Sequence, residues 1–150
     1  MKQALGNAVR RTSSPEETRA FGREIGEGLS AGDFLALSGP LGAGKTMFAK
    51  GVAEALGIDA SAVASPTFVL LRVHRGRIPL YHLDAYRLRS PSELREVGLP
   101  DLIDGDGAVL LEWAERVREA VPGGAAWIEF RNLGENEREI RISPEPFSGK

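Results

Sequence analysis

The stretch GPLGAGKT, residues 39–46, decides the fold class of this 150-residue chain. It matches the pattern G-x-x-x-x-G-K-[ST], in which glycines let backbone amides close around phosphate oxygens. A short apolar segment, residues 33–38 (DFLALS), precedes it and is predicted to be a buried strand. Residues 47–56 follow as a predicted amphipathic helix that ends at Gly57. A strand, a glycine-rich loop and a helix in this order predict an α/β nucleotide-binding domain.

Each part of the loop has a chemical task in this interpretation. The ammonium of Lys45 reaches the β- and γ-phosphates, and the hydroxyl of Thr46 ligates Mg²⁺. The start of the following helix adds partial positive charge. An ordinary glycine-rich turn is the alternative, but it does not need Lys and Thr at fixed positions. The other residues predicted to contact the phosphates are Gly39, Leu41, Gly42, Ala43 and Gly44.

Composition narrows the possible functions. The chain has 0 cysteines, which excludes disulfides, thiolate metal sites and cysteine nucleophiles, and its 2 histidines exclude a multi-histidine metal cage. A net charge of −2 argues against nucleic-acid binding by this chain alone. Because no apolar run approaches the roughly 18 residues that cross a bilayer, and the first residues are polar, we expect no membrane association and a cytoplasmic location.

The remaining pattern predicts a single domain, as expected at roughly 100–200 residues per domain. Ser14, followed by Pro15 and then by Glu17, predicts the start of a helix. Ser90 begins a similar capping pattern before a short helix. Further predicted elements are a hairpin of residues 68–73 and 78–83, a strand at 108–111, a helical stretch at 114–120, and late strands at 126–130 and 138–142. Residues 1–13 and 144–150 are expected to be frayed.

A carboxylate follows the second fully apolar strand. Glu112 comes directly after residues 108–111 (AVLL), where P-loop proteins place the acidic residue that holds the metal and its water. We therefore predict that Glu112 is catalytic and, with Thr46, a magnesium ligand. The alternative is a solvated glutamate at a strand end. Trp113, beside it, either reports on the site or packs against it.

Residues 81–88 (YHLDAYRL) form a second polar cluster. His82 and Asp84 alternate along a predicted strand and so project to the same face. Asp84 is a candidate to orient the attacking water or support the metal, and Arg87 is a candidate internal arginine finger. Composition alone is equally compatible with structural polar groups, and a lone histidine such as His82 is more often a satisfied core residue.

Four motifs in this order resemble the TsaE family, formerly called YjeE-type ATPases. They are GPLGAGKT, SPTF at residues 65–68, HLDAYRL at 82–88 and LLEW at 110–113. The resemblance runs from about residue 14 to 142. It implies a compact P-loop fold with a mixed central sheet flanked by helices. It also implies a bacterial Mg²⁺-dependent ATPase of tRNA threonylcarbamoyladenosine biosynthesis, which acts with the TsaB and TsaD proteins and meets tRNA only through that complex.

The resemblance also implies residue roles. Lys45 and Thr46 would hold phosphate and Mg²⁺, Glu112 would sit at the metal, and Asp84 would be catalytic or support the metal. Residues 65–68 would form a switch-like loop near the γ-phosphate. The base would lie between Pro15 and Arg138. The sequence departs from the family at Pro40, where an acidic residue is common, and at Ala114, where a proline is common.

Two other functions stay open at this point. A P-loop small-molecule kinase would need an arginine-rich lid, for which the chain has little length beyond residues 87–95. A nucleotide-gated binding module with negligible turnover would need no complete catalytic site. The absence of an Asn/Thr-Lys-x-Asp guanine motif favours ATP weakly over GTP. Hydrolysis is expected to be slow until a partner completes the site.

Overall fold

Seven strands form one mixed sheet in the computed structural model, which describes residues 6–40, 42–63 and 70–146. The strand order is β1-β7-β6-β2-β5-β4-β3. The strands are β1 (Ala8–Thr12), β2 (Phe34–Ser38), β3 (Leu71–Arg75), β4 (Pro79–Asp84), β5 (Ala108–Glu112), β6 (Ala126–Asn132) and β7 (Arg138–Ser143). The central strands β6, β2, β5 and β4 run parallel, and antiparallel pairs complete both sides.

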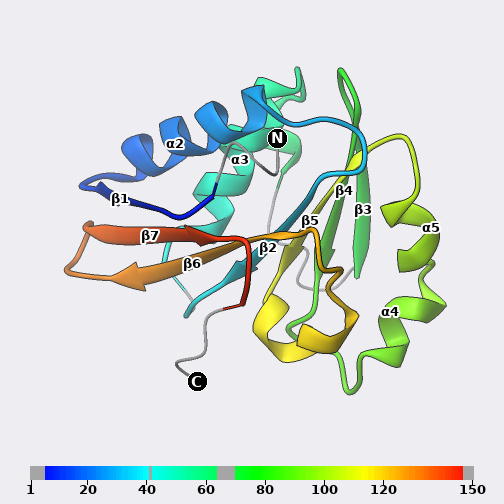
Figure 1. Cartoon of the computed structure of the whole chain (residues 1–150). Helices are drawn as coiled ribbons and strands as arrows, with labels where there is room; N and C mark the ends of the chain where they lie inside the picture. Colours follow the sequence, from blue (N-terminus) through cyan, green and yellow to red (C-terminus); the bar gives the residue numbers. More distant parts are fainter. Residues whose placement is uncertain (1–5, 41, 64–69, 147–150) are drawn as a thin grey trace.

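Helices cover both faces of the sheet (Figure 1). α2 (Pro15–Glu27) and α3 (Lys45–Ala55) pack on one face. α4 (Ser92–Glu96), α5 (Leu99–Ile103) and the 3₁₀ segment η2 (Ala114–Ala120) pack on the other. A second 3₁₀ turn, η1 (Ala60–Ala62), follows α3. Within the described ranges no helix is long and apolar enough to cross a membrane.

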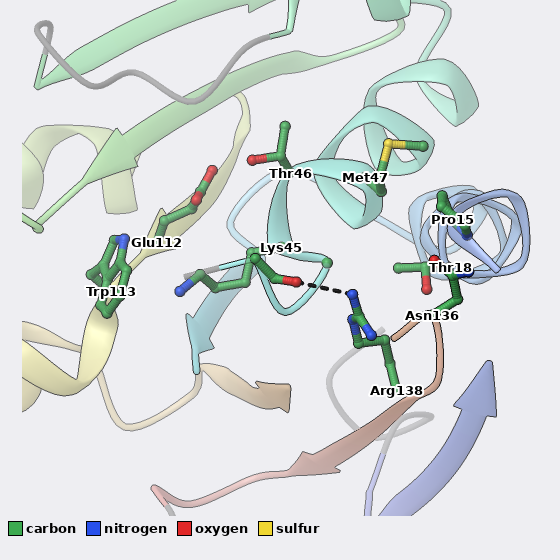
Figure 2. Close-up of a pocket in the computed structure, with 11 residues that line it drawn as sticks. Pro15, Thr18, Lys45, Thr46, Met47, Glu112, Trp113, Asn136 and Arg138 are labelled. Carbon is green, nitrogen blue, oxygen red and sulfur yellow. Dashed lines mark hydrogen bonds between the residues drawn. The ribbon is translucent and has the colours of Figure 1, made fainter. Parts of the chain in front are cut away.

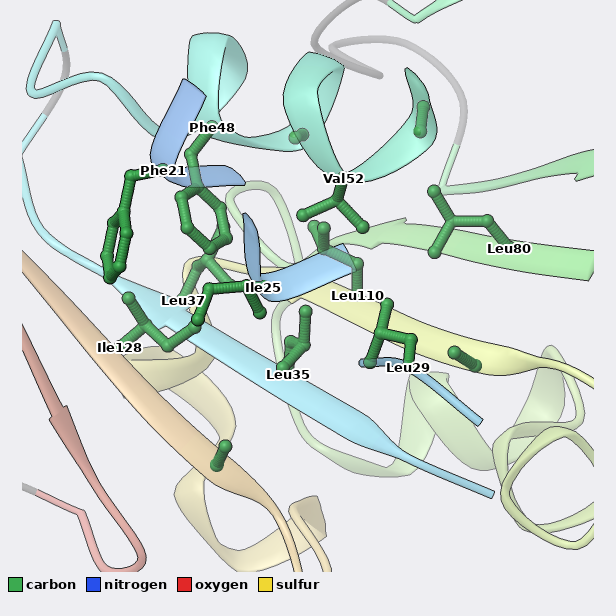
Figure 3. Close-up of a cluster of buried hydrophobic side chains, with 14 of the residues drawn as sticks. Phe21, Ile25, Leu29, Leu35, Leu37, Phe48, Val52, Leu80, Leu110 and Ile128 are labelled. Carbon is green, nitrogen blue, oxygen red and sulfur yellow. The ribbon is translucent and has the colours of Figure 1, made fainter. Parts of the chain in front are cut away.

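The sheet separates two apolar cores because strand side chains alternate between its faces. From β2, Leu35 and Leu37 point toward α2 and α3 and meet Leu110 of β5 (Figure 3). Their neighbours Phe34 and Ala36 point to the opposite core. Every residue of β2 and β5 is buried, as expected for parallel strands covered on both faces. The predicted mixed α/β sheet with flanking helices is confirmed.

The N-terminal segment corrects one expectation. Residues 1–13 were expected to be frayed, yet β1 pairs with β7 at five positions, from Ala8 opposite Ile142 to Thr12 opposite Arg138. Four of the five β1 residues are exposed, so the sequence has no alternation of apolar and polar residues that would predict a strand here. The Thr12 hydroxyl, buried against that of Thr18 at 2.7 Å, ties its end to α2.

Other element boundaries shift by a few residues. α2 begins as predicted, with Ser14 Oγ accepting from the amide of Glu17 at 3.1 Å. The predicted hairpin is β3 and β4, whose bounds lie one to three residues later; residues 68 and 69 lie outside the described part.

Ser90 provides no side-chain cap for α4, because its hydroxyl bonds that of Ser92 instead. α5 was not predicted. The C-terminal residues 144–146 follow β7, and 147–150 lie outside the described part.

Candidate nucleotide-binding site

The carboxyl ends of the parallel strands bring the predicted site residues to one edge of the sheet. β2 leads into the glycine-rich loop, and Leu37 of β2 is in register with Glu112 of β5. Asp84, the last residue of β4, is in register with Glu112 on its other side. Open α/β sheets bind their ligands at this edge. The strand order therefore brings together residues that lie far apart in the sequence.

The loop places backbone amides at the start of α3. Gly44, with φ of 101°, is the N-cap and offers no side chain to the first amides of the helix. Such amides have no partner within the helix and are suited to an anion. Gly39, with φ of 136°, lies against β6, where an added Cβ would overlap the carbonyl of Phe130. The glycines therefore serve both the amide cradle and its close contact with the sheet.

Lys45 is folded back onto its own loop. Its ammonium donates to the carbonyl of Gly39 and lies 3.5 Å from the carbonyl oxygen of Pro40. It also lies 3.5 Å from the centroid of the Trp113 ring, a cation–π contact. Burial lowers the pKa of Lys45, although Glu115, Glu112 and Asp84 act to raise it. The buried cation is thus stabilised by loop carbonyls, an aromatic face and nearby carboxylates.

A pocket of about 230 Å³ opens in front of the loop (Figure 2). Its walls come from the start of α2, the loop, the start of α3, the end of β5 and the β6–β7 turn. The lining residues are Pro15, Thr18, Gly42, Gly44, Lys45, Thr46, Met47, Glu112, Trp113, Asn136 and Arg138. Seven of the predicted site residues therefore line one pocket: Pro15, Gly42, Gly44, Lys45, Thr46, Glu112 and Arg138.

Arg138, the first residue of β7, joins the loop to the β6–β7 turn. One guanidinium nitrogen donates to the carbonyl of Gly42 at 3.1 Å (Figure 2). The other donates to the carbonyls of Gly134, Glu135 and Glu137 at 3.0–3.2 Å. One side chain therefore fixes the wall of the pocket that faces Pro15.

The carboxylates of Glu112 and Asp84 each have a hydrogen-bond partner. The carboxylate of Glu112 is buried and Oε2 lies 2.7 Å from Nε2 of His82. Asp84 Oδ1 accepts from the amide of Tyr86 at 2.8 Å. Burial raises the pKa of Asp84, the Tyr86 amide lowers it, and the neighbouring Glu112 raises it further. Asp84 does not line the pocket, although it is directly beside Glu112 in the sheet.

Some predicted residues lie elsewhere. Gly39 and Ala43 support the loop without lining the pocket: Gly39 donates its amide to Glu115 at 3.3 Å and Ala43 is buried. Arg87 is exposed and is not among the residues that line the pocket, so its role as an arginine finger stays a prediction. Leu41 and residues 65–68, including the predicted switch, lie outside the described residues.

Three residues that line the pocket were not predicted from the sequence: Thr18, Met47 and Asn136. Thr18 and Met47 lie one helical turn or less from predicted residues, so helix geometry was the only signal for them. Asn136 reaches the pocket from the β6–β7 turn. Trp113 adopts φ of 60°, the left-handed region, and its ring packs 4.9 Å from that of Tyr86. Trp113 was expected either to report on the site or to pack against it, and its ring lies over the ammonium of Lys45.

Comparison with known proteins agrees with these motifs. The family model described as "Threonylcarbamoyl adenosine biosynthesis protein TsaE" matches residues 12–140. The chain belongs to the TsaE family. The matched region includes the loop, both acidic strand ends and Arg138, so the site described above lies within it. The resemblance seen in the sequence is confirmed.

Individual TsaE proteins are similar over most of their length. The Bacillus subtilis protein "tRNA threonylcarbamoyladenosine biosynthesis protein TsaE" is 44% identical over 89% of this chain and 83% of that protein. The Treponema pallidum protein of the same name is 40% identical over 87% of this chain and 96% of that protein. A crystal structure of Bacillus subtilis YdiB has a TM-score of 0.75 at 36% identity, covering 91% of this chain and 84% of that one.

Proposed function

We propose that this chain binds ATP with Mg²⁺ and hydrolyses it for tRNA N6-threonylcarbamoyladenosine synthesis, acting with TsaB and TsaD. The observation that carries the proposal is a single pocket that combines the uncapped start of α3, Lys45, Thr46 and the buried Glu112. Membership of the TsaE family supports the pathway. With a net charge of −2, contact with tRNA is proposed through the partners, in the cytoplasm.

The donor set fits a magnesium nucleotide. Backbone amides and an ammonium suit phosphate oxygens, and a hydroxyl beside a carboxylate suits Mg²⁺. Thr46 and Glu112 are the residues that would hold the ion. When bound, Mg²⁺ neutralises charge that develops on the phosphates. The base is proposed to lie between Pro15 and Thr18 on one side and Asn136 and Arg138 on the other.

The chain's own side chains have distinct tasks in this proposal. Lys45 leaves the Gly39 carbonyl and the Trp113 ring to meet the β- and γ-phosphates, exchanging one set of polar contacts for another. Glu112 orients the attacking water through the oxygen that His82 does not occupy. Asp84, beside it, supports this arrangement from the next strand. Slow turnover is expected until a partner completes the site.

The alternative functions have different support. A small-molecule kinase would need a lid, but Leu94 of the segment after Arg87 is buried in the core on the opposite face of the sheet. A binding module with negligible turnover would use the same loop and pocket, so only a measurement of turnover separates it from an ATPase. Phosphate release from ATP, with and without TsaB and TsaD and beside a screen of phosphoryl acceptors, distinguishes all three functions.

Glu112→Gln tests the proposed site directly. The swap preserves size and removes charge, so ATP affinity measured by calorimetry should be retained. Loss of one such oriented group should slow hydrolysis with partners by about 100-fold or more. Glu119→Gln, an exposed glutamate of η2, is the matched control and should behave as wild type. Normal turnover by Glu112→Gln would show that the carboxylate lies elsewhere, and Asp84 would be tested next.

A further inference from the structure

The acidic residue of the site is held by one hydrogen bond from the core. Glu112 ends β5, and its backbone is fixed by the sheet, since its carbonyl accepts from the amide of Ala85 at 3.0 Å. The side chain has three rotatable bonds beyond that fixed backbone. Among the described residues, His82 of β4 is the hydrogen-bond partner of its carboxylate, with Nε2 and Oε2 2.7 Å apart. The imidazole is 0% exposed and the carboxylate 2% exposed.

The sheet register makes this contact possible. His82 lies opposite Leu110, so Glu112 is the diagonal neighbour two residues further along β5. Residues at such diagonal positions on the same face are within reach of long side chains. Alternate residues of a strand point to the same face of the sheet, so Leu80 lies on the face of His82, and Leu110 on the face of Glu112. Both leucines belong to the core beneath α3. The imidazole therefore lies on the sheet face that carries the glycine-rich loop.

The contacts of the two ring nitrogens of His82 differ. A carboxylate oxygen is an acceptor, and Nε2 of His82 lies 2.7 Å from Oε2, so this geometry favours the tautomer with the hydrogen on Nε2. Nδ1 of His82 is buried and has no partner among the described residues. A proton on Nδ1 alone would leave two lone pairs facing each other across the 2.7 Å contact. The surroundings therefore select the tautomer that donates to Glu112.

We propose that His82 is a positioning residue that holds Oε2 of Glu112 and thereby presents Oε1 to the pocket. This rests on the proposed hydrolytic role of Glu112. Glu112 lines the pocket, whereas His82 does not, so His82 acts through the carboxylate and not on the nucleotide. Asp84 has its own donor, the amide of Tyr86, so the adjacent carboxylates of β4 and β5 are oriented independently. Without the bond, Glu112 would turn among several rotamers.

The first test determines which ring nitrogen of His82 carries the hydrogen, and it needs no nucleotide. The chain has 2 histidines, so His74→Gln leaves His82 as the only imidazole in a tag-free, ¹⁵N-labelled protein. We expect a protonated Nε2 whose resonance shifts in the background of Glu112→Gln. A proton on Nδ1 alone, or a resonance that Glu112→Gln does not shift, overturns the proposal. His74 of β3 pairs with Leu80 of β4 and does not line the pocket, but its ring centroid lies 6.1 Å from that of His82. The spectrum is therefore also recorded with both histidines present, where the resonance of His82 is the one that we expect Glu112→Gln to shift.

The second test separates positioning from a merely structural role. In His82→Gln the side-chain amide reaches the place of Nε2, whereas in His82→Asn it stops near Nδ1. Loss of an outer partner of a metal-site ligand typically lowers activity by about 10–100-fold, and we expect that fall in kcat for His82→Asn with little change in KM. His82→Gln should recover much of it. Equal kcat for both variants, whether wild-type or low, overturns the proposal.

These outcomes are distinguishable from failure of the proposed function. If the wild-type protein with its partners releases no phosphate from ATP, the hydrolytic function fails, and with it the catalytic purpose assigned to His82. The tautomer experiment would still report whether His82 donates to Glu112. If both His82 variants fail to fold, the wild-type imidazole spectrum decides the proposal.

Discussion

At the scale of one residue, Lys45 shows how the site stabilises a buried positive charge in the absence of nucleotide. Its ammonium is buried, and burial lowers its pKa. The carbonyl of Gly39 and the face of Trp113 replace the lost water. A bound phosphate would replace both of these contacts of the ammonium. Nucleotide binding therefore exchanges these contacts for stronger ones to an anion, and the affinity reflects the difference between the two sets.

Lys45→Ala and Thr46→Ala should weaken binding in different ways. A hydrogen bond to a charged group contributes about 1.5–3 kcal/mol, so Lys45→Ala should weaken nucleotide affinity about 10–100-fold with or without Mg²⁺. Thr46→Ala should weaken binding and turnover chiefly when Mg²⁺ is present. Calorimetry with and without the ion measures both. Lys50→Ala, on the same helix but away from the pocket, is the control; equal affinities of Lys45→Ala and wild type would contradict the loop assignment.

At the scale of elements, the packing of α2 against α3 sets the width of the pocket. Pro15 and Thr18 reach the pocket from α2, and Thr46 and Met47 reach it from α3. The two helices approach closely because glycines lie at the contact. A Cβ on Gly22 would overlap the carbonyl of Phe48, and one on Gly51 would overlap the carbonyl of Arg19. The short distance between the helices thus depends on residues that have no side chain.

Gly22→Ala should separate these helices. Overpacking of a close contact costs about 1–3 kcal/mol, so the free energy of unfolding in urea should fall by that amount. Nucleotide affinity should fall as well, because the start of α3 would be displaced. Gly123→Ala, where an added Cβ meets nothing within 4 Å, should leave both measurements unchanged. An unchanged stability for Gly22→Ala would mean that the helices can move apart without loss.

Glu54 of α3 should make this helix pair sensitive to acid. Its carboxylate pairs with Arg19 and Arg23 of α2, and the hydrogen bond from Arg19 is the main cause that lowers its pKa to about 2. A lowered carboxyl pKa contributes stability above its unfolded value of 4.5, and that stability is lost as pH falls from there toward about 2. Because both side chains of the pair are partly exposed, solvent screens the interaction and its contribution to stability is small.

Urea unfolding of Glu54→Gln tests this window. The variant should be less stable than wild type at pH 7, and the difference should shrink as the pH is lowered toward 2. Glu27→Gln, an exposed carboxyl at the end of α2, serves as the control for charge removal. A difference between Glu54→Gln and wild type that stays constant across this window would contradict the ion-pair explanation.

At the scale of the whole molecule, the proposed partners must sense the nucleotide. A nucleotide gates a partner only if the partner's affinity differs between the nucleotide states. We expect the affinity for the TsaB–TsaD pair to differ between the states with an ATP analogue and with ADP. Thr67→Ala should shrink that difference if residues 65–68, which lie outside the described part, act as a switch. Titration of the pair in each state measures it, and identical affinities would leave the segment a structural turn.

The sequence by itself determined the elements whose signals are local. Three features follow from residues adjacent in the chain: the loop at residues 39–46, the buried strand that ends at Glu112, and the cap at Ser14. The structure has the strand, the cap and the described part of the loop, which omits residue 41. The family resemblance added Pro15 and Arg138, which do line the pocket. Conversely, β1 was missed, since an edge strand with exposed residues on both faces has no hydrophobic period.

Only the tertiary structure decided which distant residues meet. Arg138 reaches Gly42 across 96 residues, and His82 reaches Glu112 across 30. Both contacts depend on strand order and register, which arise from how the whole sheet packs between two layers of helices. Local sequence specifies a strand and its faces, whereas the choice of neighbour depends on burial summed over the whole domain.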